Sequence, residues 1–463
     1  MRVKSLTAAV LASFAIIGCQ SEDSPSVSGE PADFARLDAF PSQYTVPETA
    51  PVLIQNATVL DGLGNQMNDT DVRIQDGKII EIGTDLTAND GENVIDAQGR
   101  WVTPGIIDVH SHLGNYPAPS VSATQDGNEM TSPNTAGVWT EHSVHPQDPG
   151  FSRAIAGGVT ALQILPGSAN LFGGRSVVLK PVVAPTIQEM KFPDAPYGLK
   201  MACGENPKRV YGDRGGPATR MGNVEGFRNA WIAAQDYKAT WDDYAENGGD
   251  EPYRDLQLET LAGVLAGDIR IHNHCYTAEE MAVMIDLSKE FDYQITAFHH
   301  GVEAYKIADL LAENNIAGAL WADWWGFKME AYDATLANIA LMEQAGATAI
   351  VHSDSDVGIQ RLNQEAAKAM AAGNRLGMDI DIAQAWRWLS INAATSLGID
   401  DVTGSLEVGK NADVVIWSGN PFSVYTLADE VYIDGAKRFD RFDENYQQVT
   451  DFELGQRVTE EAQ

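Results

Sequence analysis

The chain has 463 residues, of which 44% are hydrophobic, and its 65 Asp and Glu outnumber its 31 Lys and Arg, which gives a formal charge of −34. This length is typical of one large α/β barrel with an accessory unit, and the apolar share suffices for a substantial core. The negative charge would repel nucleic acids and anionic lipids, so it argues against both as binding partners. We interpret it as a solvated acidic surface that carries little information about a substrate.

The N-terminus has the features of a secretory signal. Arg2 and Lys4 precede an apolar run over residues 6–17, which is too short for a bilayer span and is typical of a cleaved signal. Residues 16–19, Ile-Ile-Gly-Cys, resemble a bacterial lipobox. This likeness implies cleavage before Cys19 and acylation of its thiol, whereas an ordinary signal peptide with an incidental cysteine is the alternative.

The residues after the signal predict a flexible tether and the cellular location of the protein. Residues 20–31 are rich in Ser, Glu, Asp and Pro and have no apolar period, as in a flexible linker. We assign residues 1–18 to the signal peptide and residues 19–48 to the tether. Gln20 in place of Asp after the cysteine resembles the outer-membrane sorting pattern. We therefore expect an outer-membrane lipoprotein or a periplasmic protein of a Gram-negative cell envelope, held at the membrane only by its N-terminal lipid.

The body of the chain contains two kinds of sequence pattern. Short β-rich runs separated by Gly, Asn and Asp turns occur near both ends, and they predict a small β-sandwich formed by segments 49–104 and 405–437. Between them, apolar strand-like runs alternate with helical stretches, in roughly eight units, which predicts a (β/α)₈ barrel of the α/β class over residues 105–404. The polar, acidic residues 438–463 are expected to lie outside the core.

Cys203 and Cys275 are the only cysteines of the mature body. One pair in a chain of this size is not a disulfide framework. A single bridge would be feasible in an oxidising compartment, but we expect two buried thiols.

Metal-ligand residue types stand at the ends of several predicted strands, where the active sites of such barrels lie. In PGIIDVHSHLG, His110 and His112 are two residues apart, so both imidazoles face the barrel mouth. Three further strands end in such residues: His272 and His274, His299 and His300, and His352 and Asp354. Of the nine histidines, only His142 and His145 lie elsewhere. Satisfied core histidines would not gather in this way, so the pattern predicts a metal site.

Lys200 is the candidate for a bridging ligand. It lies within the apolar strand YGLKMAC, where a charged lysine would be costly to bury. Burial lowers the pKa of a lysine and makes its amine nucleophilic, so that it can take up CO₂ and bridge two metals as a carbamate. A lysine that reaches the barrel rim is the alternative, and Glu205 and Lys180 are rival bridging ligands.

The order of an HxH pair, a strand lysine, two histidines and an aspartate resembles the amidohydrolase superfamily, in its subtype with two metals and a carboxylated lysine. GVTALQILPGSANLFGGRSVVLK, GENPKRVYG and RLNQEAAKAM resemble the imidazolonepropionase-related branch, which includes Xaa-Pro dipeptidase-like members. The likeness covers about residues 50–437. It implies two divalent cations, by default zinc, with six ligands: His110, His112, Lys200, His272, His300 and Asp354.

The resemblance also implies a reaction, the hydrolysis of an amide or cyclic amide C–N bond by metal-activated hydroxide. Asp354 would take up the proton and deliver it to the leaving nitrogen, and His274 or His299 would stabilise the oxyanion. Deaminases of the superfamily usually carry a glutamate three residues after the fifth-strand histidine. Cys275 or Thr277 occupies that position here, which favours hydrolysis over deamination.

Three side chains are candidates for binding a small amide or dipeptide substrate. Arg175 follows the glycine-rich run 167–174, which could form a backbone nest while the guanidinium grips a carboxylate; tight turns in a βα loop are the alternative. Trp324, in the WADWWG segment, would form a wall of the pocket together with its neighbouring tryptophans. Tyr211 is a candidate of the same kind.

Other functions remain open at this point. An Xaa-Pro-type dipeptidase is the alternative enzyme, followed by a lactonase or a cyclic-imide hydrolase. A non-catalytic, ligand-binding lipoprotein with a relic site is the alternative of another class, and the presence of all six ligand types argues against it. A homo-oligomer is compatible with the sequence.

Overall fold

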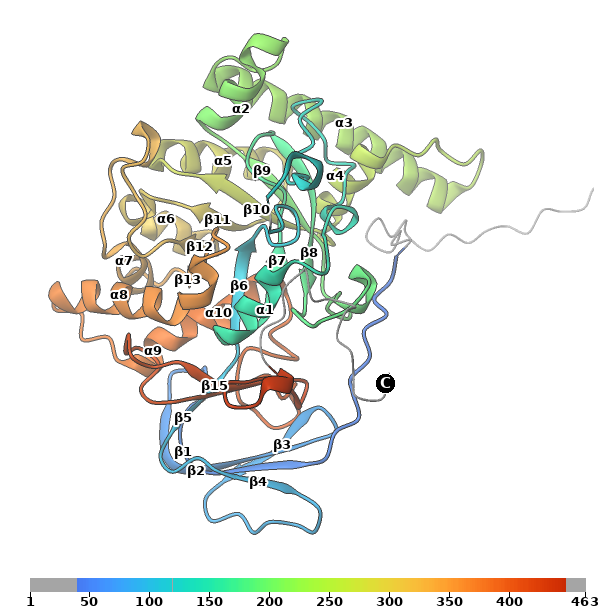
Figure 1. The fold of residues 1–463 in the computed structure, drawn as a ribbon. Coiled ribbons are helices and arrows are strands. Elements are labelled where there is room, and N and C mark those ends of the chain that lie inside the picture. The colour runs from blue at the N-terminus through green and yellow to red at the C-terminus, as the bar shows by residue number, and fades with distance from the viewer. Residues whose placement is uncertain (1–39, 119, 447–463) are drawn as a thin grey trace, which may run out of the picture.

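The computed structural model describes residues 40–118 and 120–446 (Figure 1). The predicted signal peptide, the predicted lipid-anchor residue Cys19 and the tail beyond residue 446 lie outside these ranges. Within the described part of the chain, no helix combines the length and the apolar character that a bilayer span needs.

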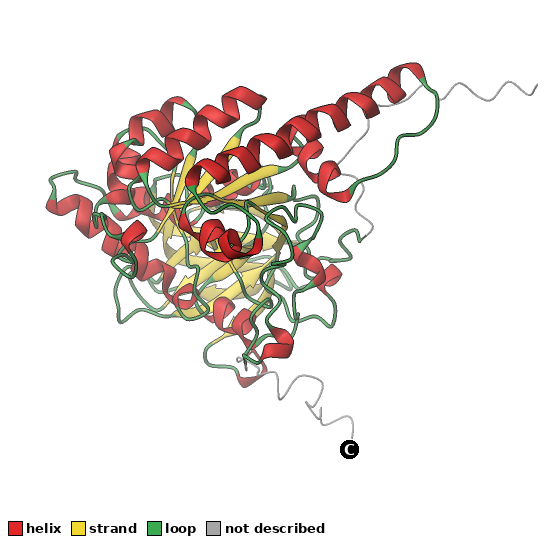
Figure 2. Cartoon of the chain, turned by 90° about the horizontal axis from the view of Figure 1, so that it is seen from above, coloured by secondary structure: helices red, strands yellow, loops and turns green. Residues whose placement is uncertain are grey.

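The centre of the molecule is a nearly closed, eight-stranded sheet surrounded by helices, as the view from above shows (Figure 2). Neighbouring strands follow the chain order around the barrel. The strands are β6 (Ile106–Ser111), β7 (Val159–Ile164), β8 (Phe172–Leu179), β9 (Gly198–Ala202), β10 (Arg270–Cys275), β11 (Ile295–His300), β12 (Ala317–Leu320) and β13 (Ala349–Val351). All residues of β6 to β9 are buried, because helices cover the outside of the barrel and side chains fill its inside. The predicted (β/α)₈ architecture is confirmed.

Strand β8 departs from the regular barrel, since it runs antiparallel to both of its neighbours. Residues 165–171 join β7 directly to β8, and so short a connection cannot form the crossover that parallel strands require. The glycine-rich run thus lies in a turn and in the strand after it. Gly174 has a φ of 120°, and a Cβ there would lie 2.5 Å from the carbonyl oxygen of Val138, so only glycine allows this close approach.

Helices follow most of the barrel strands, and the longest, α3, extends beyond the barrel together with α4 (Figure 2). The helices are α1 (Pro149–Ala156), α2 (Glu205–Tyr211), α3 (Arg220–Asn247), α4 (Leu256–Ala266), α5 (Ala278–Phe291), α6 (Ala308–Glu313), α7 (Asn338–Gln344), α8 (Leu362–Arg375), α9 (Ile382–Trp386) and α10 (Ile391–Leu397).

A second sheet lies below the barrel in Figure 1 and contains strands from both ends of the described chain. Its strands are β1 (Val52–Leu60), β2 (Gln66–Gln75), β3 (Lys78–Gly83), β4 (Asn93–Asp96), β5 (Trp101–Pro104), β14 (Val414–Trp417), β15 (Ala428–Ile433) and β16 (Ala436–Asp440). The antiparallel pairing of β5 with β14, with Val102 opposite Ile416, joins the two chain segments. A separate sheet from the terminal segments is therefore confirmed, while the exact domain boundaries stay predictions.

The first and last barrel strands meet at the residues that the sequence singles out. Strands β6 and β13 are not paired in the sheet, but the Asp354 amide donates a hydrogen bond to the His110 carbonyl at 3.0 Å. The Ser353 amide donates to the Asp108 carboxylate at 3.1 Å, and the Ser353 hydroxyl donates to the same carboxylate. These bonds bring the predicted ligands of the first and eighth strands together.

Candidate metal centre

Five of the six predicted ligands converge inside the barrel. Asp354 Oδ1 lies 3.2 Å from His112 Nε2 and 3.5 Å from His110 Nε2. Asp354 Oδ2 lies 3.8 Å from His300 Nδ1. The Lys200 Nζ atom lies 3.4 Å from the same His110 nitrogen. Side chains from four separate strand ends therefore face a common centre.

The hydrogen bond of His112 determines which of its ring nitrogens can bind a metal. His112 Nδ1 lies 2.8 Å from the carbonyl oxygen of Leu165, an atom that can only accept a hydrogen bond. Nδ1 therefore carries the ring proton, and the lone pair on Nε2 points towards Asp354. Backbone carbonyls orient metal-ligating histidines in this manner.

The predicted fifth-strand ligand, His272, lies away from this centre. Its Nδ1 lies 2.9 Å from His299 Nε2, and His299 Nδ1 lies 2.8 Å from His110 Nδ1. The His272 ring lies beside Gly198, and the register pairs His272 with Lys200 and His274 with Ala202, so His272 lies farther than His274 from the carboxyl end of β10. Both ring nitrogens of His299 are engaged, so the geometry speaks against its predicted role as an oxyanion donor.

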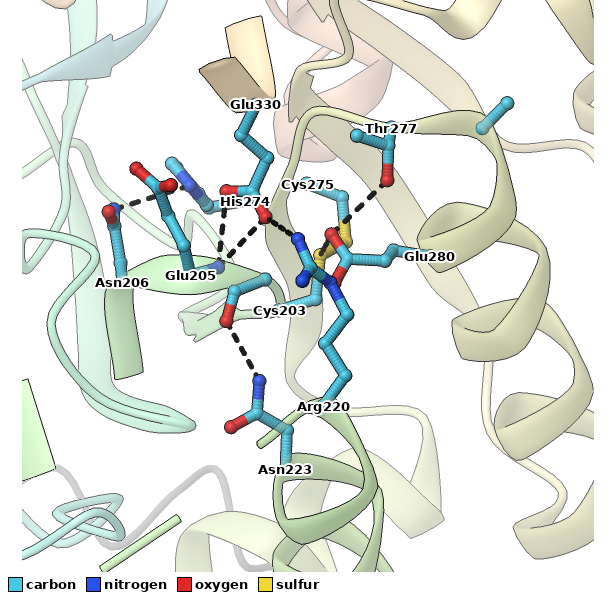
Figure 3. The surroundings of a disulfide bond; sticks show 12 residues. Cys203, Glu205, Asn206, Arg220, Asn223, His274, Cys275, Thr277, Glu280 and Glu330 are labelled. Atoms are coloured by element: carbon cyan, nitrogen blue, oxygen red, sulfur yellow. Dashed lines mark hydrogen bonds and ion pairs between the residues drawn. A yellow bond between two sulfur atoms is a disulfide. The ribbon is translucent and has the colours of Figure 1, made fainter. Parts of the chain in front are cut away.

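His274 is the residue of β10 that faces the centre. Its ring centroid lies 4.7 Å from that of His300, and its Nδ1 is buried with no hydrogen-bond partner among the described residues. Its Nε2 lies 3.4 Å from the side-chain nitrogen of Asn206, and Figure 3 marks this contact with a dashed line. The geometry thus favours His274 over His272 as the fifth-strand ligand.

His352 is a further ligand candidate, which the sequence places at a strand end but which the six ligands implied by the resemblance do not include. One nitrogen of its ring lies within 4.8 Å of nitrogens of His110 and His300. The signal was present, because His352 stands two residues before Asp354, as His110 stands two residues before His112. Residues with this spacing on a strand share a face.

Buried ring nitrogens without hydrogen-bond partners mark the centre. In the described part of the chain they are Nδ1 of His274, Nδ1 of His300 and both nitrogens of His352, and Nε2 of His272 is a further one outside the centre. Unpaired buried polar atoms are costly. Each neutral imidazole has one nitrogen with a lone pair, and a cation would satisfy the lone pairs of His300 and His352. Imidazole and carboxylate are donors that zinc prefers. The residues therefore fit a metal centre, in the groups His110–His300–His352 and His110–His112–Asp354.

Burial sets the protonation states that metal binding needs. Burial, followed by the charge of Lys200, holds the pKa of His110 well below its usual value, so this imidazole is neutral. Burial also lowers the pKa of Lys200 to about 7. For Asp354, burial acts to raise the pKa, but the neighbouring basic groups, among them His352 and Lys200, outweigh it, so the pKa falls below its usual value and the group is a carboxylate.

The backbone is strained at two of the converging residues. His300 has a φ of 73° and Asp354 a φ of 49°, in a region that side-chain-bearing residues adopt at a cost. Successive strand residues normally face opposite sides. The turn at His300 lets its ring lie 4.7 Å from that of His110, although the ring of the preceding His299 lies 4.8 Å from it as well.

Known proteins of similar sequence and fold identify the family. The model of the Amidohydrolase family matches residues 266–449. The crystal structure of an amidohydrolase from Thermotoga maritima MSB8 is 34% identical and covers 84% of this chain and 100% of its own, with a TM-score of 0.78. The chain belongs to the amidohydrolase family. It is a hydrolase acting on carbon–nitrogen bonds, as the sequence predicts.

Two curated relatives of similar sequence agree with this family assignment. Amidohydrolase tasK of Hapsidospora irregularis is 33% identical over 398 residues, which are 80% of this chain, and this chain spans 40% of the length of tasK. An imidazolonepropionase of Mesorhizobium japonicum is 24% identical over 400 residues, 78% of this chain and 90% of that protein. The resemblance to the amidohydrolase superfamily is thus confirmed.

The rival bridging ligands of this amidohydrolase contact other groups. Lys180 Nζ lies 2.6 Å from Asp434 Oδ2, beside the second sheet. Glu205 Oε1 lies 3.1 Å from Lys328 Nζ. Neither group contacts the converging residues, which leaves Lys200 as the candidate for a bridge.

Cys203 and Cys275 form a disulfide, so the expectation of two buried thiols was wrong (Figure 3). The two residues are 72 positions apart, and the pairing of β9 with β10 brings them together. The Cys203 amide donates a hydrogen bond to the His274 carbonyl at 2.9 Å. The bridge therefore ties together the strand ends that carry Lys200 and His274.

Two of the three predicted substrate-binding residues are buried away from the converging side chains. The Arg175 Nε donates to the Thr260 hydroxyl at 2.8 Å, and its guanidinium lies 4.4 Å from the ring centroid of Trp139. These contacts are structural and favour the alternative, in which the glycine-rich run serves turns. Tyr211 is buried at the end of α2.

Trp324, the predicted wall of the pocket, lies beside Trp321. Its ring centroid is 5.6 Å from that of Trp321, which in turn stacks on His300 at 4.3 Å. Trp324 and Trp325 are 40% and 50% exposed, which is unusual for tryptophan. The aromatic surface therefore continues from the centre to the solvent.

Proposed function

We propose that this amidohydrolase hydrolyses an amide or cyclic amide bond of a small molecule with two divalent cations, by default zinc. The observation that carries the proposal is the approach of Asp354 Oδ1 to His112 and His110 at 3.2 and 3.5 Å, beside Lys200. His110, His112 and Asp354 would hold one cation and His274 and His300 the other, with Lys200 and His352 as further candidate ligands.

When bound, zinc in such a donor set polarises a carbonyl group and lowers the pKa of a coordinated water to about 7. Asp354 is the proposed proton carrier, since its carboxylate lies among the proposed ligands and its side chain remains 23% exposed towards a substrate. The carboxylate accepts a proton from the nucleophile and gives it to the leaving nitrogen. General acid–base catalysis of this kind is worth roughly 10²–10⁴ in rate.

We propose that Lys200 acts as a carbamate. Burial lowers its pKa to about 7, so a large share of the amine is neutral at physiological pH and can attack CO₂ with the loss of one proton. A cation bound by the neighbouring ligands would repel the ammonium form of Lys200, whereas it would attract the carbamate form. The Lys200 amine contacts His110 Nε2 at 3.4 Å and donates to the Pro166 carbonyl at 3.1 Å.

Metal analysis followed by a substrate screen tests the proposal. Protein purified with zinc should contain about two metals per chain, and it should hydrolyse members of a panel of N-acyl amino acids, dipeptides and cyclic amides. Asp354→Asn should keep the metals and lose turnover. An active, metal-loaded Asp354→Asn protein would remove the proton carrier from the proposal. Protein that binds no metal after incubation with zinc would instead favour a non-catalytic binding protein.

We also propose that the protein is a lipoprotein of the cell envelope. The support is the Ile-Ile-Gly-Cys sequence at residues 16–19 after an apolar run, which lies outside the described residues. Labelling with a palmitate analogue in a Gram-negative host should mark the wild-type protein and not Cys19→Ser. Labelling of both proteins, or of neither, contradicts the anchor.

A further inference from the structure

A cavity of about 140 Å³ adjoins the proposed metal centre. His352 and Ser353, which line it, directly precede Asp354 in the chain. The lining combines aromatic, polar and charged side chains, among them Trp321, Trp324, His352, Ser355, Arg361 and Glu365. A group bound in this cavity would therefore lie beside the residues that we assign to the reaction.

The cation in this lining is available to a ligand. Arg361 ends the short helix Gly358–Arg361 and is exposed. Its guanidinium forms no hydrogen bond or ion pair with any residue of 40–118 and 120–446. The carboxylate of Glu365 is already paired, with Lys368 Nζ at 2.7 Å, and that lysine also pairs with Asp323 at 2.8 Å. The Arg361 guanidinium is therefore the cation of this lining that no described residue holds in a hydrogen bond or ion pair, although its charge also acts on the Glu365 carboxylate.

Other cations near the centre are engaged. Lys328 Nζ lies 3.1 Å from Glu205 Oε1 and 3.1 Å from Asn206 Oδ1, and it lies over the Tyr276 ring. Arg175 is buried against Trp139. Neither of them lines the cavity, so Arg361 is the cation that a substrate anion would meet there.

The same cavity also has an apolar part. Trp321 and Trp324 both line the cavity, and Trp321 stacks on the proposed ligand His300 with a centroid distance of 4.3 Å. An apolar group of a ligand could pack on these rings beside the proposed metal centre. Aromatic walls with a few placed polar groups are typical of small-molecule sites.

We propose that this cavity binds the acidic end of the substrate, with Arg361 paired to a carboxylate and Trp321 and Trp324 packed on the adjoining side chain. The inference rests on the proposed function and narrows it to amides with a free carboxylate, such as N-acyl amino acids and dipeptides with an apolar C-terminal residue. Arginine suits this task because its planar guanidinium binds carboxylates through two hydrogen bonds.

A pair of substrates that differ only in charge tests the proposal. N-acetyl-leucine-type acids and their C-terminal carboxamides are compared on the zinc-loaded wild type and on Arg361→Met. A lost charge-assisted hydrogen bond should lower kcat/KM for the acid by about 10–100-fold, mostly through KM, and change that for the carboxamide by less than about twofold. Arg361→Lys should restore part of the loss. Equal losses on both substrates, or none, would overturn the proposal.

The control is Arg375→Met, which removes an exposed arginine at the far end of α8, outside the cavity lining. It should leave both substrates unaffected. Loss of the acid preference in this variant would mean that overall charge, and not the cavity, selects the substrate.

Calorimetric binding to Asp354→Asn separates this proposal from the proposed function. The acid should bind at least about tenfold more tightly than the carboxamide, and this difference should vanish when Arg361→Met is added. If the wild type hydrolyses no amide while this binding pattern holds, the proposed function fails and the subsite stands. If acid and carboxamide bind equally, the subsite fails whether or not the enzyme is active.

Discussion

His299 Nε2 lies 2.9 Å from His272 Nδ1, and this contact ends a chain of imidazoles that starts at His110. His110 Nε2 faces Asp354 and Lys200, so a metal there requires the ring proton on Nδ1, which then donates to His299 Nδ1. His299 Nε2 in turn carries a proton and donates to His272. The chain thus selects the ligating tautomer of His110, a role known for groups behind a metal ligand.

Two single substitutions on β10 distinguish the ligand from the supporting residue. We expect His274→Asn to bind about one metal fewer per chain. His272→Asn should keep both metals but with about 10–100-fold weaker affinity, because it disturbs only the orientation of His110. Metal content after dialysis against graded chelator concentrations measures both effects. The reverse pattern would return His272 to the position of ligand that the sequence suggests.

Lys200 should carry a carbamate that depends on CO₂. Protein prepared with ¹³C-bicarbonate and zinc is expected to show a carbamate carbon signal by NMR, and Lys200→Met should lack it and bind metal more weakly. Lys180→Met is the matched control, because Lys180 is equally buried but paired with Asp434. A signal that persists in Lys200→Met, or disappears in Lys180→Met, contradicts the assignment.

The sequence predicts the barrel and most of the centre because its signals are local. Alternation of strands and helices is visible in the sequence, and the spacing of His110 and His112 places both on one face of a strand. The same rule cannot separate His272 from His274, since both face inward. Which of them reaches the centre depends on how far β10 is displaced along its neighbours, and this displacement is a property of the closed barrel.

Contacts between distant segments are the other part that the sequence leaves open. Nothing local shows that Cys203 and Cys275 approach each other, because pairing of β9 with β10 brings them together. Likewise, the guanidinium of Arg175 resembles a substrate ligand until Thr260 and Trp139 are seen to surround it. An unpaired cation such as Arg361 is also recognisable only when the partners of its neighbours are known.

The disulfide should stabilise the fold and hold the strand ends of the centre together. Its ends are separated by 72 residues, a span for which a bridge typically adds about 2–4 kcal/mol. We expect Cys203→Ser/Cys275→Ser to lose stability of this order in urea unfolding. The wild type should lose as much in the presence of a reductant, whereas the double variant should not respond. A reductant effect that is equal in both proteins would show that the bridge contributes nothing.

Arg220 joins two largely buried carboxylates beside this disulfide (Figure 3). Its guanidinium donates to Glu280 and, at 2.6 Å, to Glu330. Burial, followed by the charge of Glu330, raises the pKa of Glu280, while Arg220 opposes this rise. We expect Arg220→Met to cost about 1–3 kcal/mol of unfolding free energy at pH 8, less than a fully buried pair because the Arg220 side chain is 48% exposed.

The pH dependence of this loss has a definite sign. Without Arg220 the pKa of Glu280 rises further above its unfolded value, so the folded state gains stability by protonation as the pH falls. The deficit of Arg220→Met should therefore be largest above the folded pKa, at pH 8, and smaller at pH 5. Arg228 lies on α3, as Arg220 does, and forms an exposed ion pair with Glu290 of α5. Arg228→Met should cost no more than about 0.5 kcal/mol at either pH. A deficit that grows towards pH 5 would show that Arg220 does not act through Glu280, because a carboxyl group with a raised pKa stabilises the fold only in its protonated form.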